Sequence, residues 1–174
     1  MLEDTRIRCF PPVADPATAR VLILGSMPGA ASLDANQYYA HPRNQFWSIM
    51  GTLFGAHPAL PYAERLAMLT GAGVALWDVL SSCEQRGSLD SAIDLRSAQA
   101  NDFVAFLGRH AGIRRVLFNG ALAETCFRRD VMPHVRPLDM LRLPSTSPAH
   151  AGLSASDKLH AWRTALQPSA VDVV

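Results

Sequence analysis

Cysteine is scarce in this chain, and its placement argues against two common ways of stabilising a fold. The 174 residues contain three cysteines, Cys9, Cys83 and Cys126, which lie far apart and are odd in number. No CxxC pair and no cluster of histidine with cysteine occurs. A disulfide framework and a structural zinc site are therefore both unexpected, and the sequence indicates neither a metal nor a cofactor.

The chain also lacks a charge excess and a long apolar run. Its 16 basic and 15 acidic residues give a net charge of +1, so binding of nucleic acid would need a local basic patch. No run of eighteen apolar residues occurs, and the first residues are polar, unlike the apolar segment of a signal peptide. We expect a soluble, monomeric protein of the cytoplasm with no membrane partner.

Three widespread sequence motifs are missing as well. The chain contains no GxSxG nucleophile turn, no GxxxxGK[ST] phosphate loop and no GxGxxG dinucleotide fingerprint. Ordinary serine hydrolases, P-loop NTPases and dinucleotide-binding folds therefore lose support.

Short apolar runs alternate with helical patterns along most of the chain, and 49% of its residues are hydrophobic. We expect one domain over residues 20–168, preceded by an irregular, proline-containing lead-in over 1–19 and followed by a tail over 169–174. The apolar runs predict strands at residues 21–24, 74–77, 116–118 and 141–143. The alternation predicts an α/β domain with a four-stranded, mostly parallel sheet.

Helical patterns fill most of the segments between these runs. They predict helices over about 44–54, 61–71, 98–110 and 121–129, and a last helix that begins at Ser154. Ser97 is the expected cap of the third helix, and Ser154 with Asp157 resembles a capping box. The polar residues 81–94 predict a second loop on the functional side.

Each predicted strand ends in residues suited to recognition or chemistry. In chain order they are Gly25, Ser26, Met27 and Pro28, then Trp77 and Asp78, then Asn119, and finally Ser145, Thr146 and Ser147. Parallel strands bring their carboxyl ends to one edge of a sheet, where open α/β sheets bind ligands. Hydroxyl and amide groups such as those of the last set can hold phosphates.

The loop after the first strand gathers side chains that surface loops rarely combine. They are Tyr38, Tyr39, His41, Arg43, Asn44, Phe46 and Trp47. Rings, an amide and a positive charge suit a flat, polar-edged ligand attached to a phosphate, such as a nucleotide. We expect one ring of the tyrosine pair to face the interior of the loop. His41 and His150 are candidates for acid–base work or phosphate pairing.

Structural roles compete with these functional ones. Phe46 and Trp47 have the spacing of a helix that faces the core, and Asn44 can be the N-cap of that helix. Asp78 can serve as an acceptor within the fold, and Asn119 can be a turn residue. The hydroxyl groups after the fourth strand can belong to a solvated turn.

Four motifs in order carry a resemblance to a known family. They are GSMPG at 25–29 with YYAHPRNQFW at 38–47, then ALWDVL at 75–80, RGSLDS at 86–91 and LPSTSP at 143–148. Together they resemble the uracil-DNA glycosylase superfamily, first its hypoxanthine (deoxyinosine) DNA glycosylase branch and next the mismatch-specific uracil/thymine glycosylases. The resemblance runs from residue 20 to the final helix. It implies a three-layer sandwich with the sheet between helices.

The resemblance also implies an activity: a monofunctional DNA-deoxyinosine glycosylase that repairs DNA. Such an enzyme flips a deaminated base, hypoxanthine or uracil, out of DNA and hydrolyses its N-glycosidic bond without a metal. Met27 stands where better-known branches have an Asp or Asn, and Leu143 stands where the uracil enzymes have a His. The hypoxanthine branch relies on a later Asn, which falls on Asn44 as the catalytic residue.

The other site residues follow from the same resemblance. Tyr39 is the expected stacking platform for the flipped base. The remaining base-binding candidates are Gly25, Ser26, Met27, Pro28, Trp77, Asp78 and Asn119. The candidates for contact with the DNA backbone are Arg43, Arg86, Ser145, Thr146 and Ser147.

Two other function classes stay open from the sequence. A nucleoside or nucleotide hydrolase that acts on free purines could use the same pocket, and salt-sensitive binding to duplex DNA would exclude it. A lesion-binding module could flip bases without cutting them, and turnover on an inosine-containing duplex would exclude it.

Overall fold

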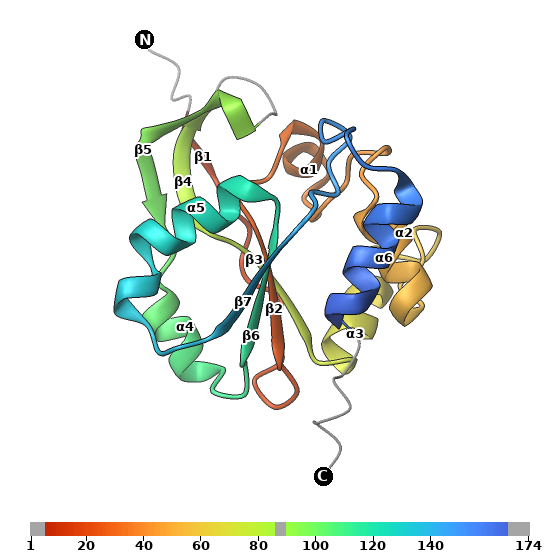
Figure 1. Ribbon diagram of the computed structural model, residues 1–174, viewed down its shortest axis with the longest axis horizontal. Helices are drawn as coiled ribbons and strands as arrows, with labels where there is room; N and C mark the ends of the chain where they lie inside the picture. Colours follow the sequence, from red (N-terminus) through yellow and green to blue (C-terminus); the bar gives the residue numbers. More distant parts are fainter. Residues whose placement is uncertain (1–5, 86–89, 167–174) are drawn as a thin grey trace.

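The computed structural model describes residues 6–85 and 90–166, and its centre is a parallel sheet (Figure 1). The strands are β2 (Val21–Gly25), β3 (Val74–Asp78), β6 (Arg115–Asn119) and β7 (Asp139–Leu143). They are arranged in the order β3-β2-β6-β7, and every neighbouring pair is parallel. The prediction of a four-stranded parallel sheet is confirmed.

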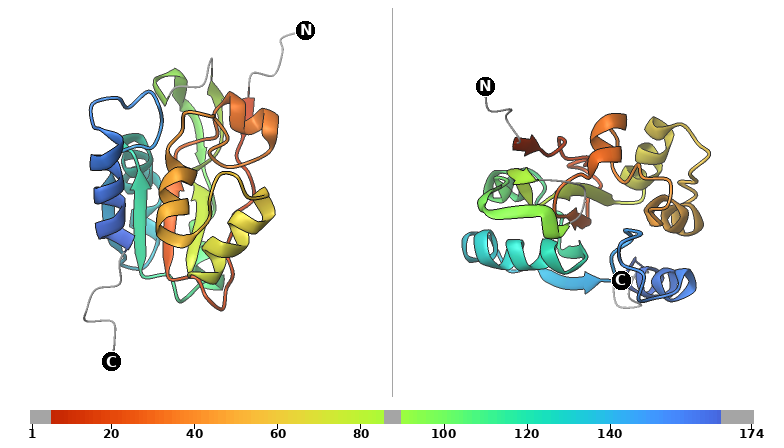
Figure 2. Two further views of the ribbon diagram at one scale, coloured as in Figure 1. Left: turned by 90° about the vertical axis from the view of Figure 1, so that its right-hand side faces the viewer. Right: turned by 90° about the horizontal axis from the view of Figure 1, so that it is seen from above.

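Helices cover both faces of this sheet, as Figure 1 shows. On one face lie α4 (Phe103–Arg109) and α5 (Ala121–Asp130). On the other lie α2 (Phe46–Phe54), α3 (Tyr62–Gly71) and α6 (Ala155–Leu166), side by side in the left view of Figure 2. The three-layer sandwich is confirmed.

Strand side chains alternate between these two faces, as the pleat of a strand requires. Leu22 and Leu24 of β2 pack into the cluster formed with α4 and α5, whereas Ile23 packs into the cluster formed with α2 and α6. Both faces are buried, so these strands appear in the sequence as continuous apolar runs.

A second, antiparallel sheet of the described residues was not predicted. It consists of β1 (Arg6–Arg8), β4 (Leu80–Gln85) and β5 (Ile93–Ala100), in the order β1-β4-β5. The irregular lead-in is therefore wrong at Arg6–Arg8, and the loop predicted over 81–94 is wrong wherever β4 and β5 occupy it. The predicted tail over 169–174 lies outside the described residues.

Ser97 belongs to this second sheet and does not cap a helix. Its hydroxyl accepts from the Glu84 main-chain N–H and donates to the Asp94 carbonyl oxygen. Both bonds lie within the second sheet, so the hydroxyl does not bond to the first turn of a helix. Helix α4 begins later, where the Asp102 carboxylate accepts from the Ala105 N–H.

Two other predicted helix ends agree with the structure, whereas α2 begins at Phe46 and not at residue 44. α2 ends at Gly55, whose φ of 77° is left-handed and suits glycine. Ser154 caps α6, since its hydroxyl accepts from the Asp157 N–H and donates to the Asp157 carboxylate. Short helical segments add α1 (Ala30–Ala35), η1 (Asp90–Ala92) and η2 (Met132–His134). None of the helices in the described part of the chain could span a bilayer.

Candidate functional site

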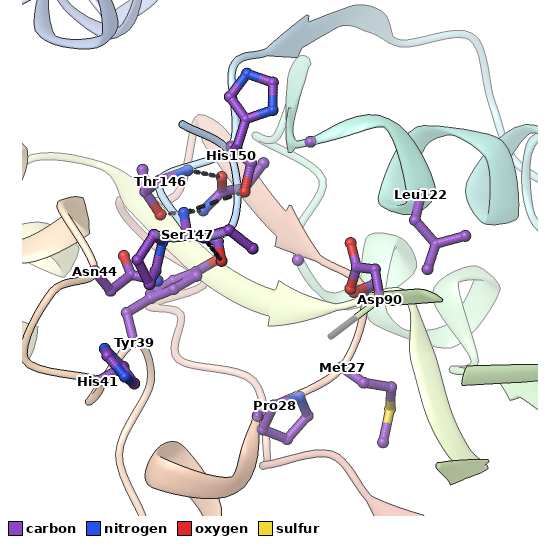
Figure 3. Close-up of a pocket in the computed structure, with 18 of the residues that line it drawn as sticks. Met27, Pro28, Tyr39, His41, Asn44, Asp90, Leu122, Thr146, Ser147 and His150 are labelled. Atoms are coloured by element: carbon purple, nitrogen blue, oxygen red, sulfur yellow. Dashed lines mark hydrogen bonds between the residues drawn. The ribbon is translucent and has the colours of Figure 1, made fainter. Parts of the chain in front are cut away.

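A large cavity opens at the carboxyl ends of the central strands, as the sheet topology predicts. Its volume is about 1240 Å³, enough for a nucleotide and its neighbours. It is lined by residues 25–32, by the loop that holds Tyr39 and Asn44, and by the strand ends at Asp78 and Asn119. Residues 142–150 complete the wall. Figure 3 shows Tyr39, Asn44 and Ser147 on one side of the cavity, and Met27, Asp90 and Leu122 on the other.

The floor of the cavity is formed by the last residues of the four strands. Across the sheet, Asp78 pairs with Gly25, and Asn119 pairs with Leu143. All four of these residues line the cavity. A side chain at Gly25 would obstruct this floor, because a Cβ there would lie 2.7 Å from the Asp78 Oδ1 and 3.2 Å from the Tyr39 hydroxyl oxygen.

Asp78 places a buried carboxyl group on this floor. The residue is 3% exposed, and its Oδ2 is buried without a hydrogen-bond partner among the described residues. Burial, and after it the negative charge of Asp90, raises the pKa of Asp78 from 3.8 to about 7. The carboxyl group can therefore be neutral near pH 7, where it is both a donor and an acceptor.

Asp90 lies at the exposed rim of the cavity and was not predicted as a site residue. Its carboxylate accepts a 2.5 Å hydrogen bond from the Ser26 hydroxyl, which joins the glycine-containing turn after β2 to η1, directly before β5. Desolvation raises the pKa of Asp90 above its ordinary value, and the bond from Ser26 offsets part of the rise. Arg86, a candidate for DNA contact, lies outside the described residues.

The two adjacent tyrosines take opposite roles. Tyr38 is buried in the core, donates to the Pro11 carbonyl oxygen and accepts the Trp47 indole N–H at its own carbonyl. Tyr39 lines the cavity and has a left-handed backbone φ of 55°. Its ring stacks on Phe46, with 4.0 Å between centroids and 26° between planes.

The Tyr39 hydroxyl reaches the cavity floor and is left without a hydrogen bond. The oxygen is buried, and no group in the described part of the chain completes a hydrogen bond to it. Burial, and then the charge of Asp78, raises the pKa of Tyr39, which the nearby Asn119 amide partly offsets. The hydroxyl is therefore protonated and free to bond to a ligand.

Asn44 lines the cavity and also bonds to the start of α2, although it is not the N-cap of that helix. Its Oδ1 accepts from the Phe46 N–H at 3.0 Å, which satisfies an amide in the first turn of α2. The N-cap residue of α2 is Gln45, so Asn44 lies one position earlier than a capping residue. The Asn44 side chain also lines the cavity, and within the described residues its amide nitrogen has no partner.

Residues 144–150, here called the serine loop, form the wall beside Asn44. Thr146 is fixed from β6, because Asn119 donates to its hydroxyl and accepts from its main-chain N–H, both at 2.9 Å. The Gln45 N–H donates to the Thr146 carbonyl oxygen and joins the serine loop to the start of α2.

Two hydroxyl groups of the serine loop remain available as donors. The Ser145 Oγ accepts from the Ser147 N–H, and the Ser147 Oγ accepts from the Ala149 N–H. In the described residues neither hydroxyl donates to a protein acceptor, so both protons can serve a phosphate oxygen. Arg43, His41 and His150 line the mouth of the cavity nearby.

Two of the predicted contacts need correction, and a third residue lines the cavity but is partly occupied by another bond. Trp77 points to the opposite face of the sheet, where its rings lie 4.9 Å from Phe103 and Phe106 and its indole donates to the Phe10 carbonyl oxygen. Thr146 is fully buried, so its hydroxyl serves Asn119 and not a DNA phosphate. Asn119 lines the floor but uses its carboxamide to hold Thr146, which limits what it can read of a base.

The remaining predicted residues do meet at the cavity. They are Gly25, Ser26, Met27, Pro28, Tyr39, Arg43, Asn44, Asp78, Ser145 and Ser147. Within the described residues, no group of three or more His, Cys, Asp or Glu side chains could hold a metal ion.

Comparison with known proteins gives consistent similarities. The family model of the uracil DNA glycosylase superfamily matches residues 11–166. A hypoxanthine DNA glycosylase of Methanosarcina barkeri is 38% identical over 112 residues, which are 64% of this chain and 69% of the relative. One of Methanosarcina acetivorans is 36% identical over 117 residues, 67% and 72% of the two chains.

A solved structure is similar over almost the whole chain. It is the solution NMR structure of a Methanosarcina acetivorans protein described as a candidate uracil DNA glycosylase. Its TM-score is 0.71 at 31% sequence identity, and the match covers 91% of this chain and 98% of the other.

Proposed function

Because this chain belongs to the uracil DNA glycosylase superfamily, we propose that it removes hypoxanthine from DNA by hydrolysing the N-glycosidic bond. The observation that carries this proposal is the cavity floor. There, two buried polar atoms, the Asp78 Oδ2 and the Tyr39 hydroxyl oxygen, lack partners within the described residues. Unpaired buried polar groups are costly, and a ligand that bonds to both would remove that cost.

A flipped purine base supplies the groups that this floor lacks. The edge of hypoxanthine carries an N–H donor and several acceptors, and the Asp78 carboxyl can pair with either kind, depending on its protonation. The Tyr39 ring, with Phe46 stacked on it, offers an aromatic face next to the floor. Base–aromatic stacking contributes about 1–3 kcal/mol, which offsets the few kcal/mol that extrusion from a duplex costs.

The chemistry needs a positioned water and stabilisation of charge. The bond between C1′ and the base nitrogen breaks with its electron pair passing to the base, while the water oxygen bonds to C1′. The water loses one proton, which ends on the departing base. Asn44 is neutral and can only orient this water and act on the sugar charge through its dipole. A protonated Asp78 can donate a hydrogen bond to the base as negative charge gathers there.

The serine loop supports DNA, and not a free nucleoside, as the substrate. Its two available hydroxyl donors and the exposed Arg43 lie at the mouth of the cavity, where the phosphates beside a flipped nucleotide would run. Phosphate contacts of this kind position the nucleic acid without reading its sequence. A monomeric state, a cytoplasmic location and the domain boundaries at residues 20 and 168 belong to the same proposal.

A panel of duplexes tests the function. Each duplex carries one hypoxanthine, uracil, xanthine or mispaired thymine, and alkali-labile abasic sites are measured. We expect strand breaks at hypoxanthine, and none with the Asn44→Ala variant as the matched control. Specific binding to the lesion without any breaks would favour a lesion-binding module. Release of the base from free inosine alone would favour a nucleoside hydrolase.

A further inference from the structure

A lysine is buried directly beneath the serine loop. Lys158 of α6 is 1% exposed, which is rare for a lysine. Its ammonium group donates to the carbonyl oxygens of His150 at 2.5 Å and of Ser147 at 3.5 Å. In residues 6–85 and 90–166 it forms no ion pair with a carboxylate. The loop therefore rests on a cation that only main-chain dipoles compensate.

The same helix holds the serine loop at its other end. Trp162 lies one turn after Lys158, and its indole N–H donates to the Pro144 carbonyl oxygen at 3.0 Å. Two side chains of one helix face thus fix the first carbonyl of the loop and its last. Because these carbonyls turn inward to α6, the Ser145 and Ser147 side chains can line the cavity on the other side.

We propose that Lys158 is a positioning residue for DNA: it shapes the serine loop from below and lends it a positive charge that attracts the phosphate beside the flipped nucleotide. This inference rests on the proposed function only in taking DNA as the ligand. Lys158 does not touch the DNA and takes no part in bond breaking. A buried charge without an ionic partner is a poor choice for stability alone, since an apolar residue of similar length often stabilises a core more.

Binding measurements separate this role from a purely structural one. The probe is a duplex with a single tetrahydrofuran abasic site, which needs no base to be read. Its dissociation constant is measured by fluorescence anisotropy at several salt concentrations, for the wild type, Lys158→Met, Lys158→Gln and Lys158→Arg. Arg163→Met is the matched control, because it removes one positive charge from the same helix away from the loop. Denaturant unfolding of each variant reports stability.

We expect Lys158→Met to weaken binding about tenfold at low salt. We expect the slope of log K against log[salt] to fall by no more than about 0.9, the value for one lost phosphate contact. The single-turnover rate at saturating hypoxanthine duplex should change less than about threefold. Lys158→Arg should restore the salt slope, and Arg163→Met should change neither slope nor affinity.

Two results would overturn the inference. One is a Lys158→Met protein that binds the abasic duplex as the wild type does at every salt concentration. If that variant does not fold, Lys158→Gln, which keeps a donor but no charge, decides in the same way. The other is an Arg163→Met protein that loses as much affinity for the abasic duplex as Lys158→Met does. The position of the positive charge on α6 would then not matter. If the wild type does not excise hypoxanthine but its DNA binding still depends on Lys158, only the proposed function is refuted.

Discussion

At the residue scale, Asn44 has a structural contact and a proposed catalytic role, and one substitution tests both. Asn44→Ala removes the acceptor for the Phe46 N–H, which should lower the free energy of unfolding by about 0.5–2 kcal/mol. It also removes the group proposed to position water, so turnover should fall at least about 100-fold. Single-turnover rates and thermal melts measure the two effects independently.

Asn44→Asp is the informative partner of this variant. It keeps the acceptor for the Phe46 N–H, so we expect it to recover stability, and its carboxylate can retain part of the activity. An Asn44→Ala protein that is destabilised but fully active would leave Asn44 with the structural role alone. Asp78 and His41 would then be the next candidates.

Tyr39 allows its ring and its hydroxyl to be tested apart. Tyr39→Ala removes the stacking face and should weaken lesion binding by about 1–3 kcal/mol and reduce turnover with it. Tyr39→Phe keeps the stack on Phe46 and removes only the hydroxyl proposed to bond to the base, so it should weaken binding less than Tyr39→Ala does. Anisotropy with a hypoxanthine duplex compares the two. Unchanged binding in Tyr39→Ala would remove Tyr39 from the site.

At the scale of elements, the end of β2 requires a glycine for reasons of space. A Cβ at position 25 would meet the Asp78 carboxyl at 2.7 Å, a distance that forces the carboxyl to move. We expect Gly25→Ala to fold, at a cost of about 1–3 kcal/mol, and to lose most lesion binding because the floor is displaced. Gly71→Ala is the matched control, since nothing lies near its added Cβ. Wild-type lesion binding by Gly25→Ala would show that the floor does not contact the base.

The elements that the sequence revealed are those with a strong local pattern. Strands buried on both faces read as apolar runs, and α2 and α6 carry recognisable ends at Gly55 and Ser154. The sequence did not predict β4 and β5, because a half-exposed antiparallel pair of strands carries polar residues such as Ser81 and Ser97, which are also common in loops. Only the pairing across the chain, which places Glu84 against Asp94, distinguishes the two.

The candidate site, like the secondary structure, could be predicted only in part. Convergence of the strand ends followed from parallel topology, and it brought Asp78, Tyr39 and Asn44 together. The alternation of side chains along a strand could have excluded Trp77 from the base-binding residues. Adjacent residues of β3 face opposite sides of the sheet, and Asp78 faces the cavity. Lys158 could not have been found, because its role depends on a carbonyl oxygen eight residues away that only the folded loop presents.

At the scale of the whole molecule, the buried Asp78 should make stability depend on pH. Its folded-state pKa of about 7 exceeds the ordinary 3.8, so between these values the folded state binds more protons than the unfolded state. Stability from this group is therefore full below about pH 4, falls as the pH rises to about 7, and is constant above. Each pKa unit corresponds to about 1.4 kcal/mol, so the loss is a few kcal/mol at most.

Asp78→Asn isolates this contribution, because its carboxamide has the shape of the neutral acid and does not ionise. We expect urea unfolding to show the variant more stable than the wild type at pH 8 and about equal at pH 4. Excision by the wild type should decline as the pH rises through about 7, because Asp78 then loses the proton that it donates to the base. The variant should not show that decline. A stability difference that is the same at both pH values would mean that folding does not raise the pKa of Asp78, so that the carboxyl is ionised at pH 7. The proposed donor would then have to be the Tyr39 hydroxyl, the other buried group on the floor without a partner among the described residues.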